Sequence, residues 1–545
     1  MIVVAYMDSN FYYSNNMQTK YIFVTGGVIS SLGKGIISAS IGKLLQARGY
    51  KVTIQKFDPY INIDPGTLNP YEHGECYVTV DGMETDLDLG HYERFTGIHT
   101  TRNNSITTGR IYKTVIDRER HGDYLGKTIQ VVPHVTDEIK RRMLRENGEN
   151  LDFVITEVGG TIGDIESAPF MEAIRQLRWQ LGRNAVCVHL TYVPYLKVAD
   201  ELKTKPTQHS VKELQSMGIQ PDILVLRTER HLDDAKRMKV ASFCNVDLEC
   251  VVQSEDMPSI YEVPVRMQEQ GLDAAILRKI GIPVGERPVM KLWHDFLARQ
   301  RSASREVCIG LVGKYDLQDA YKSIRESLIL AGIYSGVKVV LRFVNSEEIE
   351  PLTAAEKLNG IQGVLICPGF GRRGVEGKIH AAEFCRLHDL PTFGICLGMQ
   401  VMAIEFARHV LELRDADSTE MSPETAAPVI DLMEAQKAVT QKGGTMRLGA
   451  YDCELTKGSR AQQAYEGVTA VSERHRHRYE FNNRYREQFE AAGMKCTGIN
   501  PDTGLVEIVE VPDNRWYIGT QFHPEYASTV LHPHPLFMSF IKACL

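Results

Sequence analysis

The sequence lacks the marks of several protein classes. Its 11 cysteines form no Cys-x-x-Cys pair and no paired spacing, which argues against a zinc site or a disulfide framework and predicts reduced thiols in a cytoplasmic protein. No apolar run approaches the ~20 residues that a helix needs to span a bilayer. The net charge of −7 gives no electrostatic reason to expect a nucleic-acid partner. The remaining composition is that of an ordinary globular protein.

The first 16 residues, MIVVAYMDSNFYYSNN, match nothing in the pattern that follows. Their apolar run, residues 2–5, is too short for the core of a signal peptide and has no basic residue before it. We interpret residues 1–16 as a disordered extension, or as the result of an upstream start codon chosen over Met17. The sequence favours neither reading.

Two series of alternating strand-like and helix-like segments fill the rest of the chain. Its 545 residues exceed the ~250–300 that one hydrophobic core usually organises. The first series occupies residues 17–285 and the second occupies 305–545, with a polar, basic helix and linker over 286–304. Because strands that alternate with helices pair in parallel, we predict an α/β fold whose sheets are mostly parallel and covered by helices.

A cysteine between two glycines is the sharpest functional signal. The run Gly394-Ile395-Cys396-Leu397-Gly398 lies where a strand-like run meets a helix-like run, and it is the thiol counterpart of a nucleophile elbow. A helix N-terminus at Cys396 stabilises thiolate over thiol. His523 and Glu525 face one side of an extended segment and suit a general base and its orienting carboxylate. The glycine frame disfavours the alternative, a buried structural cysteine and an unrelated histidine.

A glycine-rich loop near the start of the first series is typical of a phosphate site. Residues 26–35, GGVISSLGKG, follow a strand and open a helix, so backbone N–H groups and Lys34 can surround a phosphate. The loop is one residue longer than the common P-loop, and Gly35 stands where a Ser or Thr would bind Mg²⁺. Asp88 and Glu157, in acidic segments, are our candidates for metal ligands, although each segment alone also suits a solvated turn.

Two further polar segments are candidates for nucleotide binding. Residues 203–210, KTKPTQHS, carry two lysines, two threonines and an amide, and they suit a second polyphosphate or an exposed basic turn. Asp164 and Glu166 lie on one face of a turn, where they can accept hydrogen bonds from ribose hydroxyls or cap the next helix.

These residues resemble two known families. From Glu306 to Leu545 the chain resembles the class I glutamine amidotransferases, and over residues 20–543 it resembles the CTP synthase family. The runs that carry the second resemblance are 26–35 (GGVISSLGKG), 56–62 (KFDPYIN), 84–95 (ETDLDLGHYERF), 159–167 (GGTIGDIES), 203–213 (KTKPTQHSVKE), 443–449 (GGTMRLG) and 473–479 (ERHRHRY). It implies two Rossmann-like, doubly wound domains, a P-loop amidoligase (synthetase) over 17–285 and a class I glutaminase over 305–545.

The resemblance implies a role for each matching residue. The catalytic residues are Cys396, His523, Glu525, Lys34 and Lys56. ATP would be bound by Ser31, Leu32, Gly33, Lys34, Gly35, Ile36 and Asp88, and Mg²⁺ by Asp88 and Glu157. UTP and CTP would be bound by Ser30, Asp164, Ile165, Glu166, Lys203, Thr204, Lys205, Pro206, Thr207, Gln208 and Lys239. Glutamine would be bound by Gly369, Leu397, Gly398, Met399, Gln400, Glu420 and Arg478, with the N–H groups of Gly369 and Leu397 as the oxyanion hole. His73 resembles the residue at the mouth of the family's ammonia tunnel, and residues 441–449 resemble the lid that GTP stabilises in the family.

The implied reaction is the amination of UTP to CTP, the last step of de novo CTP synthesis. ATP phosphorylates O4 of UTP, and ammonia from glutamine, or free ammonia, displaces the phosphate. Mg²⁺ is implied as a cofactor, GTP as an activator, CTP as a feedback inhibitor and a homotetramer as the assembly; filament formation stays open. The chain departs from the family at two positions: Pro368 leaves one glycine before Phe370 where relatives have two, and Cys76 replaces a valine beside the tunnel.

Two other classes of protein are alternatives. Cobyrinate-type amidases also join a P-loop to a glutaminase-like domain, but they should lack the His-x-Glu pair and the KTKPTQ loop. Filament-forming scaffolds of the ParA or MinD kind need no Cys-His-Glu triad. The sequence has all of these features, so we predict a CTP-forming ligase.

Overall fold

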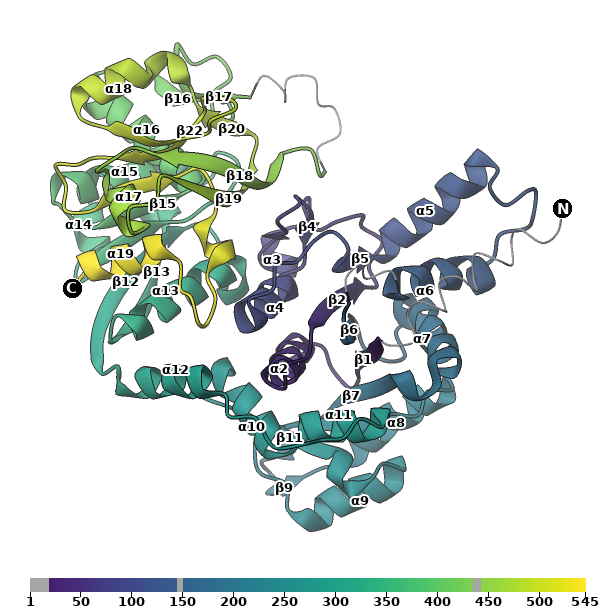
Figure 1. The fold of residues 1–545 in the computed structure, drawn as a ribbon. Coiled ribbons are helices and arrows are strands. Elements are labelled where there is room, and N and C mark those ends of the chain that lie inside the picture. Colours follow the sequence, from purple (N-terminus) through teal and green to yellow (C-terminus); the bar gives the residue numbers. More distant parts are fainter. Residues whose placement is uncertain (1–18, 145–149, 434–435, 437–442) are drawn as a thin grey trace. The chain divides into compact units, whose positions relative to one another are not determined.

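The computed structural model describes residues 19–144, 150–433, 436 and 443–545, and its chain forms two compact units (Figure 1). The first unit contains the described residues up to Asp64 together with His91–Lys291. The second unit contains Pro65–Gly90 and Leu292–Leu545. Residues 1–16, for which the sequence left two interpretations, lie outside the described residues. In the described part of the chain, no helix has the length and apolarity that crossing a bilayer requires.

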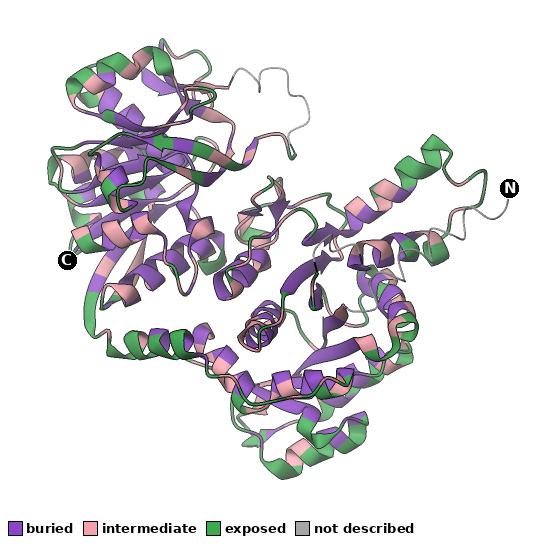
Figure 2. Ribbon diagram, viewed as in Figure 1, coloured by how far each residue is buried: buried purple, intermediate pink, exposed green. Residues whose placement is uncertain are grey.

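The first unit is built on a parallel sheet of seven strands in the order β11-β10-β7-β1-β6-β2-β5. The strands are β1 (Lys20–Gly26), β2 (Val52–Asp58), β5 (Ser105–Thr107), β6 (Phe153–Val158), β7 (Ala185–Val193), β10 (Ile223–Thr228) and β11 (Val251–Glu255). Successive residues of β1, β2 and β6 are buried, as Figure 2 shows for the strands in purple, so helices cover both faces. This confirms the α/β class predicted from the apolar runs.

The helices of this unit follow the strands in sequence. They are α2 (Lys34–Ala47), α5 (Thr108–His121), α6 (Thr136–Leu144), α7 (Ala168–Leu181), α8 (Lys205–Ser216), α9 (Asp234–Cys244), α10 (Val263–Glu269) and α11 (Leu272–Ile280), and α4 (Asp88–Thr96) begins at the boundary of the two units. The short strands β8 (Tyr195–Leu196) and β9 (Glu201–Leu202) form a hairpin before α8.

The second unit contains a sheet of nine strands in the order β13-β12-β14-β15-β23-β22-β21-β18-β19. The strands are β12 (Arg305–Gly313), β13 (Val337–Asn345), β14 (Gly363–Ile366), β15 (Thr392–Ile395), β18 (Arg447–Leu455), β19 (Ala470–His477), β21 (Lys495–Ile499), β22 (Val506–Glu510) and β23 (Tyr517–Thr520). The pairs from β13 to β23 are parallel, and those from β23 to β19 are antiparallel. The sheet is therefore parallel only at the end that carries the nucleophile.

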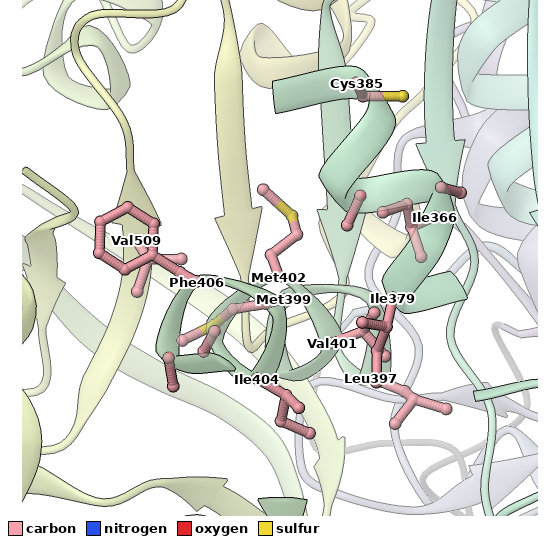
Figure 3. Packing of buried hydrophobic residues seen from close by; sticks show 14 of the residues in the cluster. Ile366, Ile379, Cys385, Leu397, Met399, Val401, Met402, Ile404, Phe406 and Val509 are labelled. Atoms are coloured by element: carbon pink, nitrogen blue, oxygen red, sulfur yellow. The ribbon is translucent and has the colours of Figure 1, made fainter. Parts of the chain in front are cut away.

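Helices and a small sheet surround this larger sheet. The helices are α3 (Pro70–His73), α12 (Lys291–Ser302), α13 (Lys322–Tyr334), α14 (Ala354–Lys357), α15 (Val375–Leu387), α16 (Leu397–His409), α17 (Arg460–Ala464), α18 (Arg486–Ala492) and α19 (Pro535–Ala543). The small sheet comprises β16 (Ala416–Ser418), β17 (Ala427–Leu432) and β20 (Tyr479–Phe481), and β3 (Tyr77–Val78) pairs with β4 (Glu84–Thr85). Helix α16 is buried from Leu397 to Ala407, and Figure 3 shows its apolar side chains packed among those of α15 and the strands.

The structure assigns residues 65–90 to a different unit than the sequence analysis did. The sequence places them in the domain of residues 17–285, whereas they cluster with the second unit. Arg474 of β19 donates to Tyr77 Oη at 3.0 Å and to Val78 O at 2.9 Å, and Gly449 packs directly against the backbone of Gly82. These contacts are long-range, so the local pattern of strands and helices did not reveal them.

Candidate active site

Cys396 sits on a sharp turn between β15 and α16. Its φ of 53° and ψ of −106° are strained for a non-glycine residue. The flanking glycines provide the space, because a Cβ on Gly394 would lie 2.3 Å from Met402 Sδ, and one on Gly398 would lie 2.2 Å from Ile366 O. The turn places the sulfur at the N-terminus of α16, where the helix dipole favours a thiolate.

A buried carboxylate orients the imidazole of His523. Nδ1 of His523 lies 2.7 Å from Oε1 of Glu525, and the two residues are 4% and 3% exposed. Burial lowers the pKa of His523, but the negative charges of Glu525 and Cys396 outweigh burial and raise that pKa to about 10. His523 is therefore protonated at neutral pH. The sulfur also lies 3.7 Å from both Arg476 O and Gln521 Nε2.

A buried lysine orients the backbone that follows β14. Lys378 of α15 donates from Nζ to Cys367 O at 2.6 Å and to Pro368 O at 3.5 Å. In a trans peptide the N–H points opposite to the C=O, so the second contact turns the Gly369 N–H away from Lys378. Gly369 lines the cavities that meet at the nucleophile. The segment thus has an oriented donor although it carries a single glycine.

The charge of Lys378 is expected to set one limb of the pH profile. Burial lowers the pKa of this lysine from 10.5 to about 8. Glutaminase activity should fall as the pH rises through about 8, because the ammonium that holds the two carbonyls then loses its charge. In Lys378→Met the activity at pH 7 should be lower on the order of tenfold, the effect of losing a charge-assisted hydrogen bond. Glutamate release measured from pH 6 to 10 should lack the limb near 8 in this variant. An unchanged limb would assign the titration to another group.

The larger cavity beside Cys396 has the polar groups that an amino acid needs. It encloses about 490 Å³ in the second unit, and its lining includes Gln400, Glu420, Arg478 and Tyr479. Burial raises the pKa of Glu420. A carboxyl and a guanidinium in the same lining match the ammonium and carboxylate groups of an α-amino acid.

A smaller cavity lies between Cys396 and residues 65–90. It encloses about 290 Å³ and is lined by His73, Cys76, Arg476 and Tyr526 as well as by Cys396. The cavity lies wholly within the second unit. Cys396 therefore lines both the polar pocket and this second cavity.

Strand β19 positions both the nucleophile and residues 65–90. Alternate side chains of a strand point to opposite faces, so Arg474 and Arg476 lie on one face and His475 lies on the other. The Arg476 guanidinium pairs with Glu84 Oε1 at 2.8 Å, whereas His475 Nε2 lies 2.6 Å from Glu507 Oε2. The alternation of arginine and histidine in ERHRHRY is thus the alternation of the strand.

The glycine-rich loop of the first unit leads directly into α2. Gly33, with φ 87°, is the N-cap of α2, and Lys34 begins the helix. Val28 and Ser31 also have positive φ values, 82° and 57°. Nζ of Lys34 donates to Gly160 O at 2.5 Å, which brings the loop against the segment after β6. Backbone N–H groups and a lysine at a helix N-terminus form a site for phosphate.

Lys56 and Glu157 meet near the carboxyl ends of β2 and β6. Nζ of Lys56 lies 3.0 Å from Glu157 Oε1, and the residues are 5% and 1% exposed. Tyr92 donates to the other carboxylate oxygen at 2.5 Å. Ligands of open α/β sheets bind at this end of the strands, so the pair lies where a phosphoryl group would be handled.

Two known protein families match most of the chain. The family described as "CTP synthase N-terminus" matches residues 20–282, and "Glutamine amidotransferase class-I" matches residues 316–543. A protein named CTP synthase from Bacteroides fragilis is 69% identical over 530 residues, which cover 97% of this chain and 99% of that protein. The chain belongs to the CTP synthase family. A second CTP synthase, from Porphyromonas gingivalis, is 63% identical over 529 residues and covers 97% and 98% of the two chains.

A solved structure also matches part of the chain. The glutaminase domain of Trypanosoma brucei CTPS with bound acivicin is 37% identical, covers 44% of this chain and 93% of that chain, and has a TM-score of 0.41. Members of the CTP synthase family are glutamine-dependent ligases that aminate UTP to CTP with ATP. The class of fold and the enzyme class predicted from the motifs are therefore confirmed.

The residues that the resemblance with CTP synthases singled out fall into two spatial groups. In the first unit, the phosphate loop supplies Ser30, Ser31, Leu32, Gly33, Lys34, Gly35 and Ile36, β2 and β6 supply Lys56 and Glu157, the turn before α7 supplies Asp164, Ile165 and Glu166, and α8 with its leading loop supplies Lys203, Thr204, Lys205, Pro206, Thr207 and Gln208. In the second unit, Cys396, His523, Glu525, Gly369, Gln400, Glu420 and Arg478 line the larger or the smaller cavity.

Three predicted residues and one predicted segment lie outside these two groups. Met399 packs in the core of Figure 3, whereas the alternative Gln400 faces the pocket. Lys239 is exposed on α9. Asp88 begins α4 and clusters with the second unit. The predicted lid, 441–449, lies partly outside the described residues, which resume at Gly443.

Several residues of this family member were missed by sequence reasoning. A cavity of about 60 Å³ adjoins the phosphate loop at Gly33 and is lined by Arg227, Ser254, Met257 and Ile260, among others. Arg227 and Ser254 lie near the carboxyl ends of β10 and β11, so the rule that ligands bind at this sheet edge would have indicated them. No comparable local signal marks Lys378, which acts across the fold on the backbone of another segment.

Proposed function

We propose that this chain makes CTP from UTP by two coupled reactions, one in each unit. The observation that carries the proposal is the Cys396–His523–Glu525 arrangement, which opens into a polar pocket and a second cavity. The phosphate loop and the buried Lys56–Glu157 pair support an ATP-dependent reaction in the first unit. A glutaminase and a phosphoryl-transfer site on one chain fit an amidoligase better than a scaffold.

The glutaminase reaction follows from the geometry of the second unit. The Cys396 thiolate attacks the amide carbon of glutamine, and the N–H groups of Gly369 and Leu397 stabilise the oxyanion. His523 then donates its proton to the leaving ammonia. A water molecule, deprotonated by the same imidazole, hydrolyses the thioester to glutamate. Glu525 holds the ring in position through both steps.

The synthetase reaction would use the phosphate loop and the Lys56–Glu157 pair of the first unit. O4 of UTP attacks the γ-phosphorus of ATP and ADP leaves, with Lys34 and Lys56 stabilising charge on the transferred group. Nitrogen of ammonia then bonds to C4, the C4–O4 bond breaks, and phosphate and a proton leave. UTP would be bound by Ser30, residues 203–208 and Lys239.

For Mg²⁺ we propose Glu157 as the ligand in the first unit, because this ion usually takes one or two carboxylates together with substrate phosphates. Asp88, the other ligand predicted from the sequence, clusters with the second unit. Within the described ranges no three His, Cys, Asp or Glu side chains gather as a metal cluster, which suits a metal that arrives with the nucleotide. When bound, the ion would neutralise phosphate charge.

Ammonia would leave the glutaminase through the smaller cavity. His73 and Cys76 line that cavity, which supports their assignment to the tunnel. Cys76 has about the size of the valine in relatives, so ammonia should pass. GTP would act on the lid at 441–449. The guanidinium of Arg478 donates to Gln436, which precedes that segment, and at 3.1 Å to Thr445 Oγ1, which lies within it. We further propose a cytoplasmic homotetramer.

One assay tests the proposed function. UTP, ATP and Mg²⁺ are supplied with either glutamine or ammonium chloride, and CTP is followed by its ultraviolet spectrum and by chromatography. CTP should form with both nitrogen sources, and chelation of Mg²⁺ should stop it. Absence of CTP with both sources would contradict the proposal, and amidation of a different carboxylate in its place would favour a cobyrinate-type amidase.

Feedback by CTP is expected to depend on Glu166. CTP shares its triphosphate with UTP and differs at the base, so a residue that contacts only the ribose or amino group can discriminate the two. Asp164 and Glu166 are exposed on the turn before α7. Glu166→Ala should raise the CTP inhibition constant about tenfold and the UTP half-saturation less than twofold, as for the loss of one hydrogen bond to a charged group. Equal changes in both constants would mean that Glu166 binds what the nucleotides share.

A further inference from the structure

A buried histidine of the first unit joins two elements that carry different substrate loops. His189 lies on β7, beside Thr25 of β1 in the register of the parallel sheet. Nδ1 of His189 is 2.8 Å from Thr25 Oγ1, and Nε2 is 2.8 Å from Ser210 Oγ on α8. His189 and Thr25 are at most 1% exposed, and Ser210 is 6% exposed. The three polar groups therefore form a buried chain of hydrogen bonds.

This chain ends at the two loops that the proposed function assigns to ATP and UTP. Thr25 directly precedes the phosphate loop, and Ser210 lies two residues after Gln208 in α8. The loops also touch, because a Cβ on Gly27 would lie 1.8 Å from Ser210 Oγ. Gly27 N donates to Leu190 O at 3.0 Å, which holds the phosphate loop against the strand of His189. The phosphate loop is therefore packed directly against the first turns of α8 and the end of β7.

The charge state of His189 fixes which groups donate and which accept in these two hydrogen bonds. Burial, with the nearby charge of Lys34, lowers the pKa of His189 to about 3, so the ring is neutral at physiological pH. A neutral imidazole donates from one nitrogen and accepts at the other. One hydroxyl must then donate to the ring while the other accepts from it. The two hydrogen bonds can reverse only together, which makes Thr25 and Ser210 interdependent.

We infer that His189 is a positioning residue that couples binding of the phosphoryl donor to binding of the pyrimidine-nucleotide acceptor through Thr25 and Ser210. The inference rests on the proposed function, because it takes the two loops to bind ATP and UTP. When ATP orders the loop after Thr25, the hydrogen-bonded chain holds α8 and residues 203–208 in the position that binds UTP. By thermodynamic reciprocity, UTP must favour ATP binding by the same factor.

The test measures this coupling directly. The half-saturation for UTP is determined with ammonium chloride as the nitrogen source, at low and at saturating ATP, so that the glutaminase does not contribute. In the parent the half-saturation should fall about fivefold or more at saturating ATP, a typical coupling factor. Thr25→Val and Ser210→Ala should each bring this ratio close to one. The double variant should lose no more than either single variant, because both interrupt the same chain.

Matched variants separate positioning from packing. Thr25→Ser keeps the hydroxyl and should keep the ratio. Thr156→Val removes a buried hydroxyl of the same sheet that donates to Gln55 Oε1 at 3.1 Å and reaches neither loop, so it should keep the ratio as well. Thermal unfolding of all variants reports any loss of stability.

Three results would overturn the inference. Single variants that lose stability but keep the parent ratio would show that the histidine only packs. A ratio close to one in Thr156→Val would show that the loss of any buried hydroxyl of the sheet abolishes the coupling. A parent that forms CTP with no dependence of the UTP half-saturation on ATP would refute the coupling and leave the proposed function intact, whereas a parent that forms no CTP would refute both.

Discussion

Alanine at position 396 is expected to abolish CTP formation from glutamine, by a factor on the order of 10³ or more, as for the loss of a catalytic nucleophile. CTP formation from added ammonia should stay within about twofold of the parent, because Cys396 only generates ammonia. Both rates are measured on the same preparation with UTP, ATP and Mg²⁺ at saturation. The ratio of the two rates is then independent of the amount of active protein.

A second cysteine provides the control for this substitution. Cys308 lies on β12 in the same unit, is partly exposed and lines neither cavity at Cys396, so Cys308→Ala should leave both rates unchanged. Loss of the ammonia-dependent rate in Cys396→Ala, at unchanged thermal stability, would contradict the assignment of the two reactions to separate sites.

Lys34→Ala is expected to stop CTP formation with either nitrogen source, on the order of 10³-fold, because phosphoryl transfer precedes amination. The lysine begins α2 and contacts Gly160 O, so its removal takes a positive charge from the phosphate loop without emptying a hydrophobic core. Basal glutamine hydrolysis in the absence of nucleotides should be unchanged, since the triad lies in the other unit. The measurements are CTP formation and glutamate release.

An exposed lysine of the same unit is the matched control. Lys51 precedes β2 and is exposed, so Lys51→Ala should behave as the parent. Near-normal CTP formation by Lys34→Ala would mean that the loop has a structural role and that another group stabilises the transferred phosphoryl.

Local patterns were sufficient to predict the elements that carry the chemistry. The elbow at Cys396 and the turn before Lys34 are each specified by a few neighbouring residues, because glycines permit the backbone and helix N-termini stabilise anions. The His523–Glu525 contact follows from a spacing of two on an extended segment. The α/β class follows from apolar runs whose burial on both faces the structure bears out.

What the sequence did not reveal depends on contacts between distant segments. Residues 65–90 lie with the second unit because guanidinium groups of β19 bind Tyr77 and Glu84, nearly 400 positions away. The oriented Gly369 peptide depends on Lys378, whose position in a helix gives no hint of the backbone that it contacts. The hydrogen bonds of His189 likewise depend on strand register, which a single strand does not specify.

Two cysteines line the smaller cavity, and this has a consequence for covalent inhibitors. Cys76 and Cys396 both line it, whereas burial raises the pKa of thiols such as Cys385 to about 12, which slows their alkylation. A compact electrophile that enters this space therefore meets two targets. Labelling should exceed one adduct per chain, and a glutamine analogue should shield only the site at position 396. An adduct at Cys76 should leave glutamine hydrolysis intact and narrow the route that we propose for ammonia. Such an adduct would uncouple nitrogen release from its use.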